Sequence, residues 1–574
     1  MPVLLRRAMT VIAVVIMMGL CCVVTADAGD KKDALHKINH IVVLYQENHS
    51  FDNLYGLWEG VNGLNKAHIP QIGQNGIVLG CLPQVDVNLL SPEPLPVTCS
   101  YHGYGHNIDS HFTNALFPID DFISPKDNTC PKPDDKSENG IAKGNGESGG
   151  CTMDLDHRFY QEIYQIDGGK MDRYVVGSNA AGLTMGYYNT KRLPIYVYLH
   201  AKGHPNYVIA DNFFQAAFGG SFLNHQWLIA AKTPLWLEAV NDGSKADLHA
   251  VVDLNGMPKN TPLYASPTKE ALKDNPLTAS CYPGEGRNST PPTVVCGDYA
   301  VNTIQPGAWP YNPKADKDSM RLPPLTYPTI GDRLNDAGVD WAWYSGGWAS
   351  AEGDNTQPGY TAGNGPSCPE SAIKGSSWPK CPDRLFQFHH QPFNYFAAYA
   401  PGTEARKKHL RDEVEFIQLA KSSKHKHCNL KPVSFVKPLG NENEHPGYSS
   451  EWNSNAHLID LIKAVENSVC ARDTMVIVAY DEFGGQADHV TPPDAANSKG
   501  PYDQWGPGTR IPVLIIAPNL RNKFAIDHQE HDTTSIMATI AHRFNLVPLG
   551  SRDEKVEDLS TVFNAKKSYE QQKK

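Results

Sequence analysis

The chain has 574 residues, of which 20% are charged and 40% hydrophobic. This length and composition exclude a disulfide-held miniprotein, a disordered chain, a collagen and a coiled coil. The formal net charge of -11 argues against a general nucleic-acid binder and against adhesion to anionic membranes, because both need a cationic surface. The 23 histidines, together with abundant proline and glycine, indicate many loops around a site that uses imidazole.

The N-terminal residues read as a targeting segment. Arg6 and Arg7 precede an apolar run from Met9 to Val24, which is followed by Ala26-Asp27-Ala28. This order predicts a secretory signal peptide over residues 1–28. The alternative, a membrane anchor, is disfavoured because the run is short for a bilayer span of about 20 residues. We therefore expect an exported protein, periplasmic or extracellular, with no integral membrane segment in its mature chain.

Short β-branched runs alternate with helical patterns along the rest of the chain. The predicted strands are His40–Tyr45, Tyr207–Ala210, Val339–Tyr344, Val433–Val436, Thr474–Tyr480 and Ile511–Ala517. The predicted helices are Leu193–Lys202, Phe222–Ala231, Thr329–Ala337, Glu404–Ala420, Asn455–Val469 and Thr534–Phe544. The alternation predicts an α/β fold with a central, mostly parallel sheet sandwiched by helices.

Two stretches, near residues 70–150 and 240–325, interrupt this alternation and are rich in Gly, Pro and Cys. We expect one catalytic domain over residues 29–574 that carries both stretches as long insertions. Ten cysteines follow the signal segment, with no C-x-x-C spacing, and an even number in an exported chain favours disulfides. The sequence does not fix their connectivity; pairing of consecutive cysteines in five local bridges is the interpretation we adopt.

Acidic and amide side chains follow two of the predicted strands directly. Glu47-Asn48 comes after the first strand, and Asp481-Glu482 comes after a late one. In an open α/β sheet, ligands bind beyond the carboxyl ends of the strands, so both pairs can converge on one point. Grouped oxygen donors of this kind suit a divalent metal ion. Taken pair by pair, an ordinary turn and a helix cap are the competing interpretations.

A third candidate element is Gly219-Gly220-Ser221, which opens a predicted helix after another strand. Two glycines allow a close backbone approach, and a helix start favours an anion. In isolation Ser221 could equally be a helix cap. Beside a metal ion its hydroxyl could attack phosphorus, and Asn224, one turn later, would face the same way and donate to a phosphoryl oxygen.

Four histidines on predicted loops are candidates for the positive charge that a phosphoryl group would need beside the metal ion: His157, His389, His390 and His445. Imidazoles near pKa 6.5 would stay charged at mildly acidic pH and would fit an acidic optimum.

Together these segments resemble a known family. The residues that carry the resemblance are INHIVVLYQENHSFDNLYG (38–56), ADNFFQAAFGGSFLNHQWLIAA (210–231), VNTIQP (301–306), FHHQPFNYF (388–396), VKPLGNENEHPGY (436–448), VAYDEFGGQADHVTPP (478–493), GTRIPVLIIAP (508–518) and HDTTSIMATIAHRF (531–544). They are similar to the bacterial phosphoesterase family, which includes secreted acid phosphatases and non-haemolytic phospholipases C. The resemblance implies an alkaline-phosphatase-like fold with a metal-activated nucleophile.

Carried over by motif, the resemblance implies a metal site, a nucleophile and a ring of polar groups. The implied metal ligands are Glu47, Asn48, Ser221, Asp481 and Glu482, for one divalent ion whose identity the sequence does not give. Ser221 would also be the nucleophile, His390 and His445 catalytic, and Asn224, His157 and His389 substrate-binding. His157 has the loosest match to the family pattern.

Serine at position 221 is more similar to the acid phosphatase branch, because the phospholipase branch more often has threonine in a G-T-x-x-N setting. We therefore expect an acid phosphatase that hydrolyses small phosphate monoesters through a phosphoserine. The alternative is a phospholipase C that cleaves phosphatidylcholine-like phospholipids. A serine α/β-hydrolase would need a G-x-S-x-G elbow, which Gly219-Gly220-Ser221-Phe222-Leu223 does not match. A non-enzymatic binding protein would need no convergent acidic pairs.

Overall fold

The computed structural model of the chain describes most of the predicted catalytic domain. The described residues are 34–73, 75–83, 95–123, 154–178, 180–234, 324–360, 386–494, 500–550 and 552–567, with two short strands at 251–252 and 295–296. The predicted signal segment, the VNTIQP motif and most of the stretch 240–325 lie outside them. Within the described residues, no helix has the length and apolar character needed to cross a membrane.

The described elements form one large sheet, several two-stranded sheets and the helices that cover them. The large sheet contains β1 (His40–Gln46), β6 (Tyr207–Ala210), β10 (Trp341–Ser345), β11 (Leu410–Asp412), β12 (Val433–Lys437), β13 (Thr474–Tyr480), β14 (Val513–Ile516) and β15 (Phe524–Asp527). The α-helices are α2 (Phe51–Leu54), α3 (Phe159–Ile166), α4 (Pro194–His200), α5 (Ser221–Ala230), α7 (Ile330–Asp336), α8 (Trp348–Glu352), α9 (Glu404–His409), α10 (Glu413–Ser422), α11 (Glu451–Glu466) and α12 (Thr534–Phe544). The short sheets pair β2 (Cys99–Gly103) with β3 (His106–Ser110), β4 (Phe117–Pro118) with β5 (Gly186–Tyr187), β7 (Phe213–Phe214) with β16 (His531–Asp532), and β8 (Val251–Val252) with β9 (Val295–Cys296).

The large sheet has the strand order β11-β10-β12-β1-β13-β14-β6-β15. Its strands run parallel except β14, which is antiparallel to both neighbours. β1 and β13 lie side by side at the centre, and their side chains are almost all buried, as expected where both faces of a parallel sheet are covered. The predicted fold class is therefore confirmed, with one antiparallel strand that alternation alone did not indicate.

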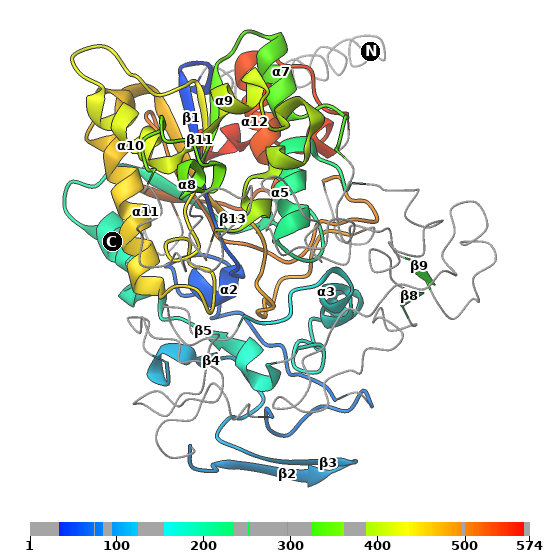
Figure 1. Cartoon of the computed structure of the whole chain (residues 1–574). Coiled ribbons are helices and arrows are strands. Elements are labelled where there is room, and N and C mark those ends of the chain that lie inside the picture. Colours follow the sequence, from blue (N-terminus) through cyan, green and yellow to red (C-terminus); the bar gives the residue numbers. More distant parts are fainter. Residues whose placement is uncertain are drawn as a thin grey trace, which may run out of the picture.

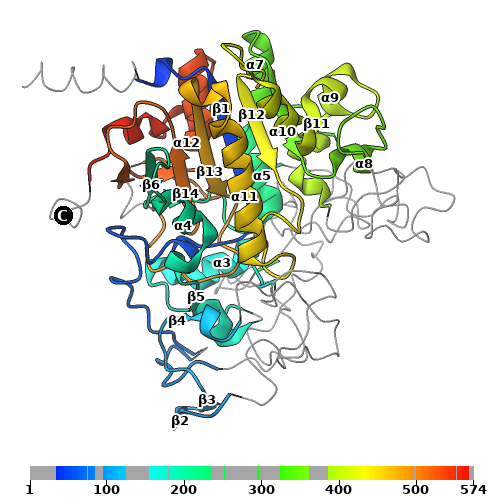
Figure 2. The same ribbon diagram turned by 90° about the vertical axis from the view of Figure 1, so that its left-hand side faces the viewer.

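Helices cover both faces of this sheet. α4, α10 and α11 pack on one face, and α5, α7 and α12 lie on the other (Figure 1). The view from the side shows α11 in front of the strands (Figure 2). β1 leads directly into α2 at the lower end of the sheet in Figure 1, so the carboxyl ends of the parallel strands face downward there. This is the edge at which the sequence predicts a site.

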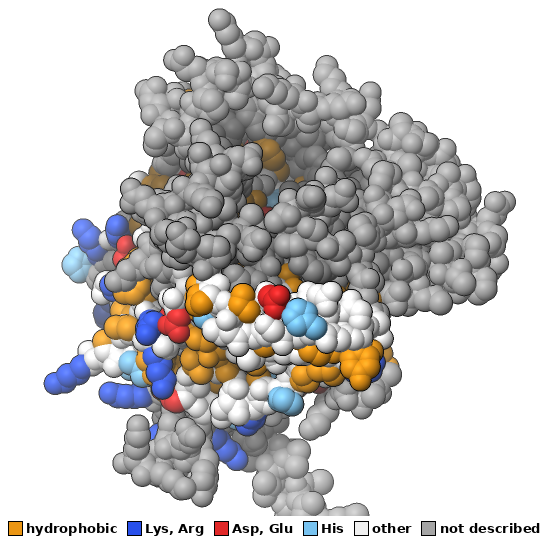
Figure 3. Space-filling model, turned by 90° about the horizontal axis from the view of Figure 1, so that it is seen from below, with side chains coloured by type: hydrophobic (Ala, Val, Ile, Leu, Met, Phe, Trp, Pro, Cys, Tyr) orange, Lys and Arg blue, Asp and Glu red, His pale blue; other side chains and the backbone are white. Residues whose placement is uncertain are grey.

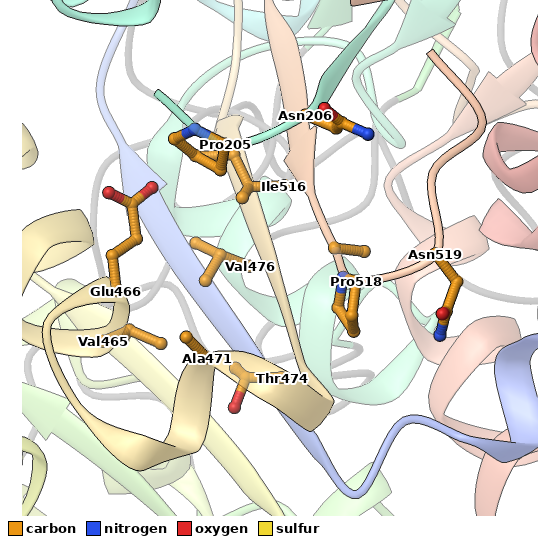
Figure 4. A pocket seen from close by; sticks show the side chains of 11 residues that line it. Pro205, Asn206, Val465, Glu466, Ala471, Thr474, Val476, Ile516, Pro518 and Asn519 are labelled. Carbon is orange, nitrogen blue, oxygen red and sulfur yellow. The ribbon is translucent and has the colours of Figure 1, made fainter. Parts of the chain in front are cut away.

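The upper, opposite edge of the sheet carries a pocket of a different character. It has a volume of about 220 Å³ and is lined mainly by apolar side chains, among them Val465, Val476 and Ile516 (Figure 4). Glu466, at the end of α11, is its one acidic lining residue and accepts a hydrogen bond from the Tyr198 hydroxyl. This pocket therefore lacks the grouped polar side chains that catalysis requires.

One predicted helix is wrong. The segment Glu404–Ala420 forms α9 and α10 with the short strand β11 between them. Leu410 and Asp412 pair in register with Trp343 and Ser345 of β10, so sheet pairing overrides the helical periodicity. Sequence patterns also missed β15, which pairs with β6 at the other end of the sheet.

Two of the expected disulfides are present, Cys81–Cys99 and Cys428–Cys470, both between consecutive cysteines. The other six cysteines have no described side chains. Cys81–Cys99 ties the β2–β3 hairpin within the stretch 70–150. The hairpin projects below the sheet in Figure 1, and the view from below shows hydrophobic and histidine side chains close together on this end of the molecule (Figure 3).

Candidate active site

The five residues predicted as metal ligands lie together at the carboxyl edge of the sheet. The Ser221 Oγ is 3.0 Å from Glu47 Oε2, 3.2 Å from Asn48 Oδ1 and 3.4 Å from Glu482 Oε1. Asp481 joins them because its Oδ1 accepts hydrogen bonds from the backbone nitrogens of Asn48, at 3.0 Å, and Glu482, at 2.8 Å. All five are at most 4% exposed. Three segments far apart in the sequence therefore converge on one point.

The pairing of β1 with β13 explains why two of these segments meet. Gln46 is opposite Tyr480 in the parallel register, so the next residue of each strand emerges at the same place. The turn after β13 then folds tightly onto the turn after β1. A Cβ at Gly484 would lie 2.2 Å from the Asn48 carbonyl oxygen, and its φ of +64° also favours glycine.

Two residues, Gly219 and Asn224, determine the shape of the loop before Ser221. Gly219 has a φ of +89°, and a Cβ there would lie 2.7 Å from the Phe159 nitrogen at the start of α3. The Asn224 carboxamide donates to the carbonyls of Ala217 and Gly219 and accepts a hydrogen bond from the Ala217 nitrogen. The Asn224 side chain therefore holds the loop before Ser221, because a backward-pointing helical side chain reaches the preceding turn; its predicted donation to a phosphoryl oxygen stays a prediction.

The charges at this point are not balanced by the protein alone. Burial and the neighbouring Glu47 raise the pKa of Asp481 well above its ordinary value. Burial and Asp481 do the same to the pKa of Glu482. Asp481 Oδ2 is buried without a hydrogen-bond partner, and the single Ser221 proton faces three acceptor oxygens. A divalent cation among these oxygens would remove both problems, so the donor set fits a hard metal ion.

Glu47 differs from the two other carboxylates because two basic side chains, Lys437 and His390, contact it. Burial alone would raise its pKa, but His390 and Lys437 hold the pKa well below its ordinary value. The Lys437 ammonium donates to Glu47 Oε1, and His390 Nε2 lies 3.1 Å from the same oxygen. Glu47 therefore presents one oxygen to Lys437 and His390 and the other to Ser221.

Two residues of this cluster escaped the sequence analysis. Lys437 is the last residue of β12, so the rule that polar residues at strand ends face the site would have found it. His225 follows Ser221 by one turn of α5, donates through Nδ1 to the Ser221 carbonyl at 2.8 Å, and stacks on His390. Spacing of four residues on a helix was the available signal.

The four predicted histidines lie around the acidic cluster, and burial lowers the pKa of three of them. Burial lowers the pKa of His389 well below its ordinary value, and it lowers that of His390 to about 4. Burial also lowers the pKa of His157. The expectation of unperturbed imidazoles that are charged at mildly acidic pH is therefore wrong for His389 and His390, because burial takes their rings out of water; for His157 the pKa is shifted in the same direction.

His157 and His445 lie on the Asn48 and Glu482 side of the cluster. His445 Nδ1 donates to the Pro446 carbonyl, so its Nε2 accepts from Asn48 Nδ2 at 3.0 Å and turns Asn48 Oδ1 toward Ser221. His157 Nε2 lies 3.5 Å from Glu482 Oε1. The rings of His157 and His445 approach each other edge to face. Several groups of histidine and carboxylate side chains in the described residues could hold a metal, and one of them joins Glu47 to His225 and His390.

Comparisons with known proteins found a matching family, curated relatives and solved structures. The sequence profile of the Phosphoesterase family matches residues 38–547. Phospholipase C B of Mycobacterium tuberculosis is 23% identical over 565 residues, covering 94% of this chain and 80% of that protein. Phospholipase C A of the same organism is 23% identical, covering 94% and 79%. A solved structure from Vibrio parahaemolyticus, of a protein in the alkaline phosphatase superfamily, is 13% identical with a TM-score of 0.26, covering 63% of this chain and 62% of that one.

Proposed function

The chain belongs to the Phosphoesterase family, and from that premise we propose that it is an exported, metal-dependent hydrolase of phosphate esters with Ser221 as nucleophile. The observation that carries the proposal is the position of the Ser221 hydroxyl, within 3.4 Å of oxygens from Glu47, Asn48 and Glu482. A buried serine in this setting has acceptors for its proton, and histidines contact each of those acceptor residues. A serine that merely capped a helix would need none of them.

The ion would be held by Glu47, Asn48, Asp481, Glu482 and Ser221. When bound, a divalent cation supplies Lewis-acid chemistry, lowering the pKa of a hydroxyl and offsetting charge on phosphoryl oxygens. The protein holds the donors in place: Lys437 fixes Glu47, His445 fixes the carboxamide of Asn48, and backbone nitrogens fix Asp481.

The reaction proceeds in two displacements. The Ser221 hydroxyl gives its proton to a neighbouring carboxylate, Glu47 or Glu482, and Oγ attacks phosphorus in line; a new P–O bond forms to the serine, and the bond to the leaving alcohol breaks. The leaving alkoxide takes up one proton, and His390 and His445 are the candidates to relay it from solvent, each taking up a proton before it gives one. A water oxygen then attacks the phosphoserine, the bond to Ser221 breaks, and phosphate leaves. The turns after β1 and β13 pack tightly on each other, so they hold the groups around Ser221 in a fixed position for in-line attack.

We assign phosphate monoesters as substrates first, because the nucleophile is serine and histidines gather around it to meet a group with three terminal oxygens. A phospholipase C activity is the second candidate. It is favoured by the two mycobacterial relatives, which match nearly the whole chain and bear that name. In both reactions the attacking serine is the same, and only the leaving group and the substituent on phosphorus differ.

Purified mature protein should be assayed with p-nitrophenyl phosphate and with p-nitrophenylphosphorylcholine in the presence of added Mg²⁺, Ca²⁺, Mn²⁺ or Zn²⁺. A higher kcat/KM for the first substrate supports the phosphatase, and a higher value for the second supports the phospholipase C. Ser221→Ala should reduce turnover of both by about 10⁴-fold or more while circular dichroism stays unchanged. Turnover within tenfold of the native rate in that variant would refute the nucleophile.

A further inference from the structure

A buried carboxylate lies directly behind the nucleophile loop, outside the set of residues described so far. Glu162, on α3, is 0% exposed and does not touch Ser221 or any of the candidate metal ligands through a hydrogen bond. α3 also begins at the backbone that presses on Gly219, where a Cβ would meet the Phe159 nitrogen. The helix is thus packed against the turn that delivers the serine.

The Glu162 carboxylate accepts four hydrogen bonds. Its Oε2 takes one from the Gly219 nitrogen at 2.5 Å and one from Gln215 Nε2 at 2.9 Å. Its Oε1 takes two from Thr509, one from the nitrogen and one from the hydroxyl, both at 2.7 Å. Every partner is a donor, so the ionised form alone satisfies all four. Burial raises the pKa of Glu162 to about 7, and the donors act against that rise.

Gln215 extends this network to the acidic turn after β13. Its Oε1 accepts from the Phe483 nitrogen at 2.9 Å, next to Glu482, while its Nε2 also donates to the carbonyls of Ala217 and Gly219. The Glu162–Gln215 pair therefore connects the loop that carries Ser221 with the loop that carries Glu482. A second link between these two loops is the contact of the Ser221 hydroxyl with Glu482 Oε1, which belongs to the reacting groups themselves.

We propose that Glu162 is a positioning residue, which through Gly219 and Gln215 sets the distance between the Ser221 hydroxyl and the acidic turn. The inference rests on the proposed function, since the serine must be the attacking group for its placement to matter. Displacement of a reacting group by about 1 Å can cost on the order of 10²-fold in rate. A carboxylate suits the position because each of its two oxygens faces two donors. An amide would place its own NH₂ group against two of these donors and push the loop away.

The decisive variant is Glu162→Gln, assayed beside Glu466→Gln as a matched control. Glu466 is a partly buried carboxylate with its own hydrogen bond from Tyr198, and it lies at the opposite edge of the sheet (Figure 4). We expect kcat of Glu162→Gln to fall by about 10- to 100-fold with KM changed less than threefold. Glu466→Gln should keep its kcat, whatever both variants lose in melting temperature.

Two binding measurements separate positioning from loss of stability. Orthovanadate resembles the five-coordinate transition state, whereas inorganic phosphate resembles the product. In Glu162→Gln the Kd of vanadate should rise at least tenfold and the Kd of phosphate less than threefold, with metal content by mass spectrometry unchanged. A proportional rise of both constants, or a kcat within twofold of the native value, would overturn the inference.

A milder variant guards against a protein that fails to fold. Thr509→Val removes one of the four donors and keeps the volume, so kcat should fall about 3- to 10-fold in a stable protein. An unchanged kcat in a folded Thr509→Val protein together with an insoluble Glu162→Gln would count against the inference. These outcomes are independent of the Ser221→Ala result, which alone decides the nucleophile.

Discussion

Two buried clusters of charged side chains lie on the same pair of loops, the turns that follow β1 and β13. The first, the balanced cluster, consists of two acidic residues, Asp52 and Asp488, and two basic ones, Arg510 and His489. Asp52 Oδ1 lies 3.0 Å from Arg510 Nη2, and both oxygens of Asp488 accept from the Arg510 Nε at 3.2 and 3.3 Å. Asp52 Oδ2 lies 2.6 Å from His489 Nδ1 and also accepts from the His489 backbone nitrogen, so each carboxylate oxygen has a partner.

The second, the metal-site cluster, consists of Glu47, Asp481 and Glu482 around Ser221. Lys437 compensates one of its three carboxylates, and Asp481 Oδ2 is left without a partner. Both clusters are almost fully buried and begin only a few residues apart. Because both clusters are desolvated to a similar degree, burial does not explain why only one of them has all its charges paired. The difference between them is therefore one of function. The balanced cluster joins the loops, whereas the metal-site cluster keeps a net negative charge that a bound divalent cation would neutralise.

Asp481→Asn is expected to have the largest effect on turnover. It removes a predicted ligand, so kcat/KM should fall by about 10³-fold and metal content should drop below one ion per chain. In chelator-treated protein the same change should raise the unfolding temperature, because it relieves repulsion between buried carboxylates. The native Asp481 pKa is raised, so this advantage should grow as pH increases from about 4. Differential scanning fluorimetry at pH 5 and pH 8 measures it.

Asp488→Asn makes the same chemical change seven residues later and should do the opposite. It leaves the buried Arg510 with one carboxylate partner, Asp52, instead of two, which costs about 3 kcal/mol of unfolding free energy with or without a chelator. Activity per folded molecule should change less than tenfold. Urea unfolding followed by tryptophan fluorescence gives the free energy. If Asp488→Asn stabilised the apo-protein as Asp481→Asn does, the distinction between the clusters would fail.

The sequence predicts the convergence of Glu47, Ser221 and Asp481 because strand ends in a parallel sheet share one edge. That rule depends only on local patterns and on topology. It does not separate the two clusters, since Asp52 and Asp488 occur in the same motifs as the ligands. Their pairing with Arg510 depends on β14 running antiparallel, which periodicity does not reveal. The direction of the Asn224 carboxamide and the lowered pKa of His390 also depend on three-dimensional packing.

Lys437→Met probes the charge of the metal-site cluster. With Lys437 and one divalent ion, three carboxylates give a neutral site; without the lysine the site is negative by one charge. We therefore expect the Kd of inorganic phosphate to rise about tenfold, and the Kd of the divalent ion to fall, because a competing cation is gone. Isothermal titration calorimetry measures both. Weaker binding of both ligands would instead indicate that Lys437 acts by holding the Glu47 side chain in position.

A third cluster tests whether balance alone explains stability, and it should give the smallest effect. His457 Nε2 lies 2.7 Å from Glu413 Oε1 and 3.8 Å from Glu442 Oε2. Burial alone would lower the His457 pKa, but Glu413 outweighs it and raises the pKa to about 9. A raised histidine pKa stabilises the fold fully below about pH 6.5, and the contribution is lost as pH rises through about 9.

The free energy of unfolding should therefore fall by about 1 to 2 kcal/mol more between pH 6.5 and pH 10 in the native protein than in Glu413→Gln. The difference between the two proteins cancels other titrations in this range. A difference that does not change with pH would show that the His457–Glu413 pair acts through its hydrogen bond and not through its charge.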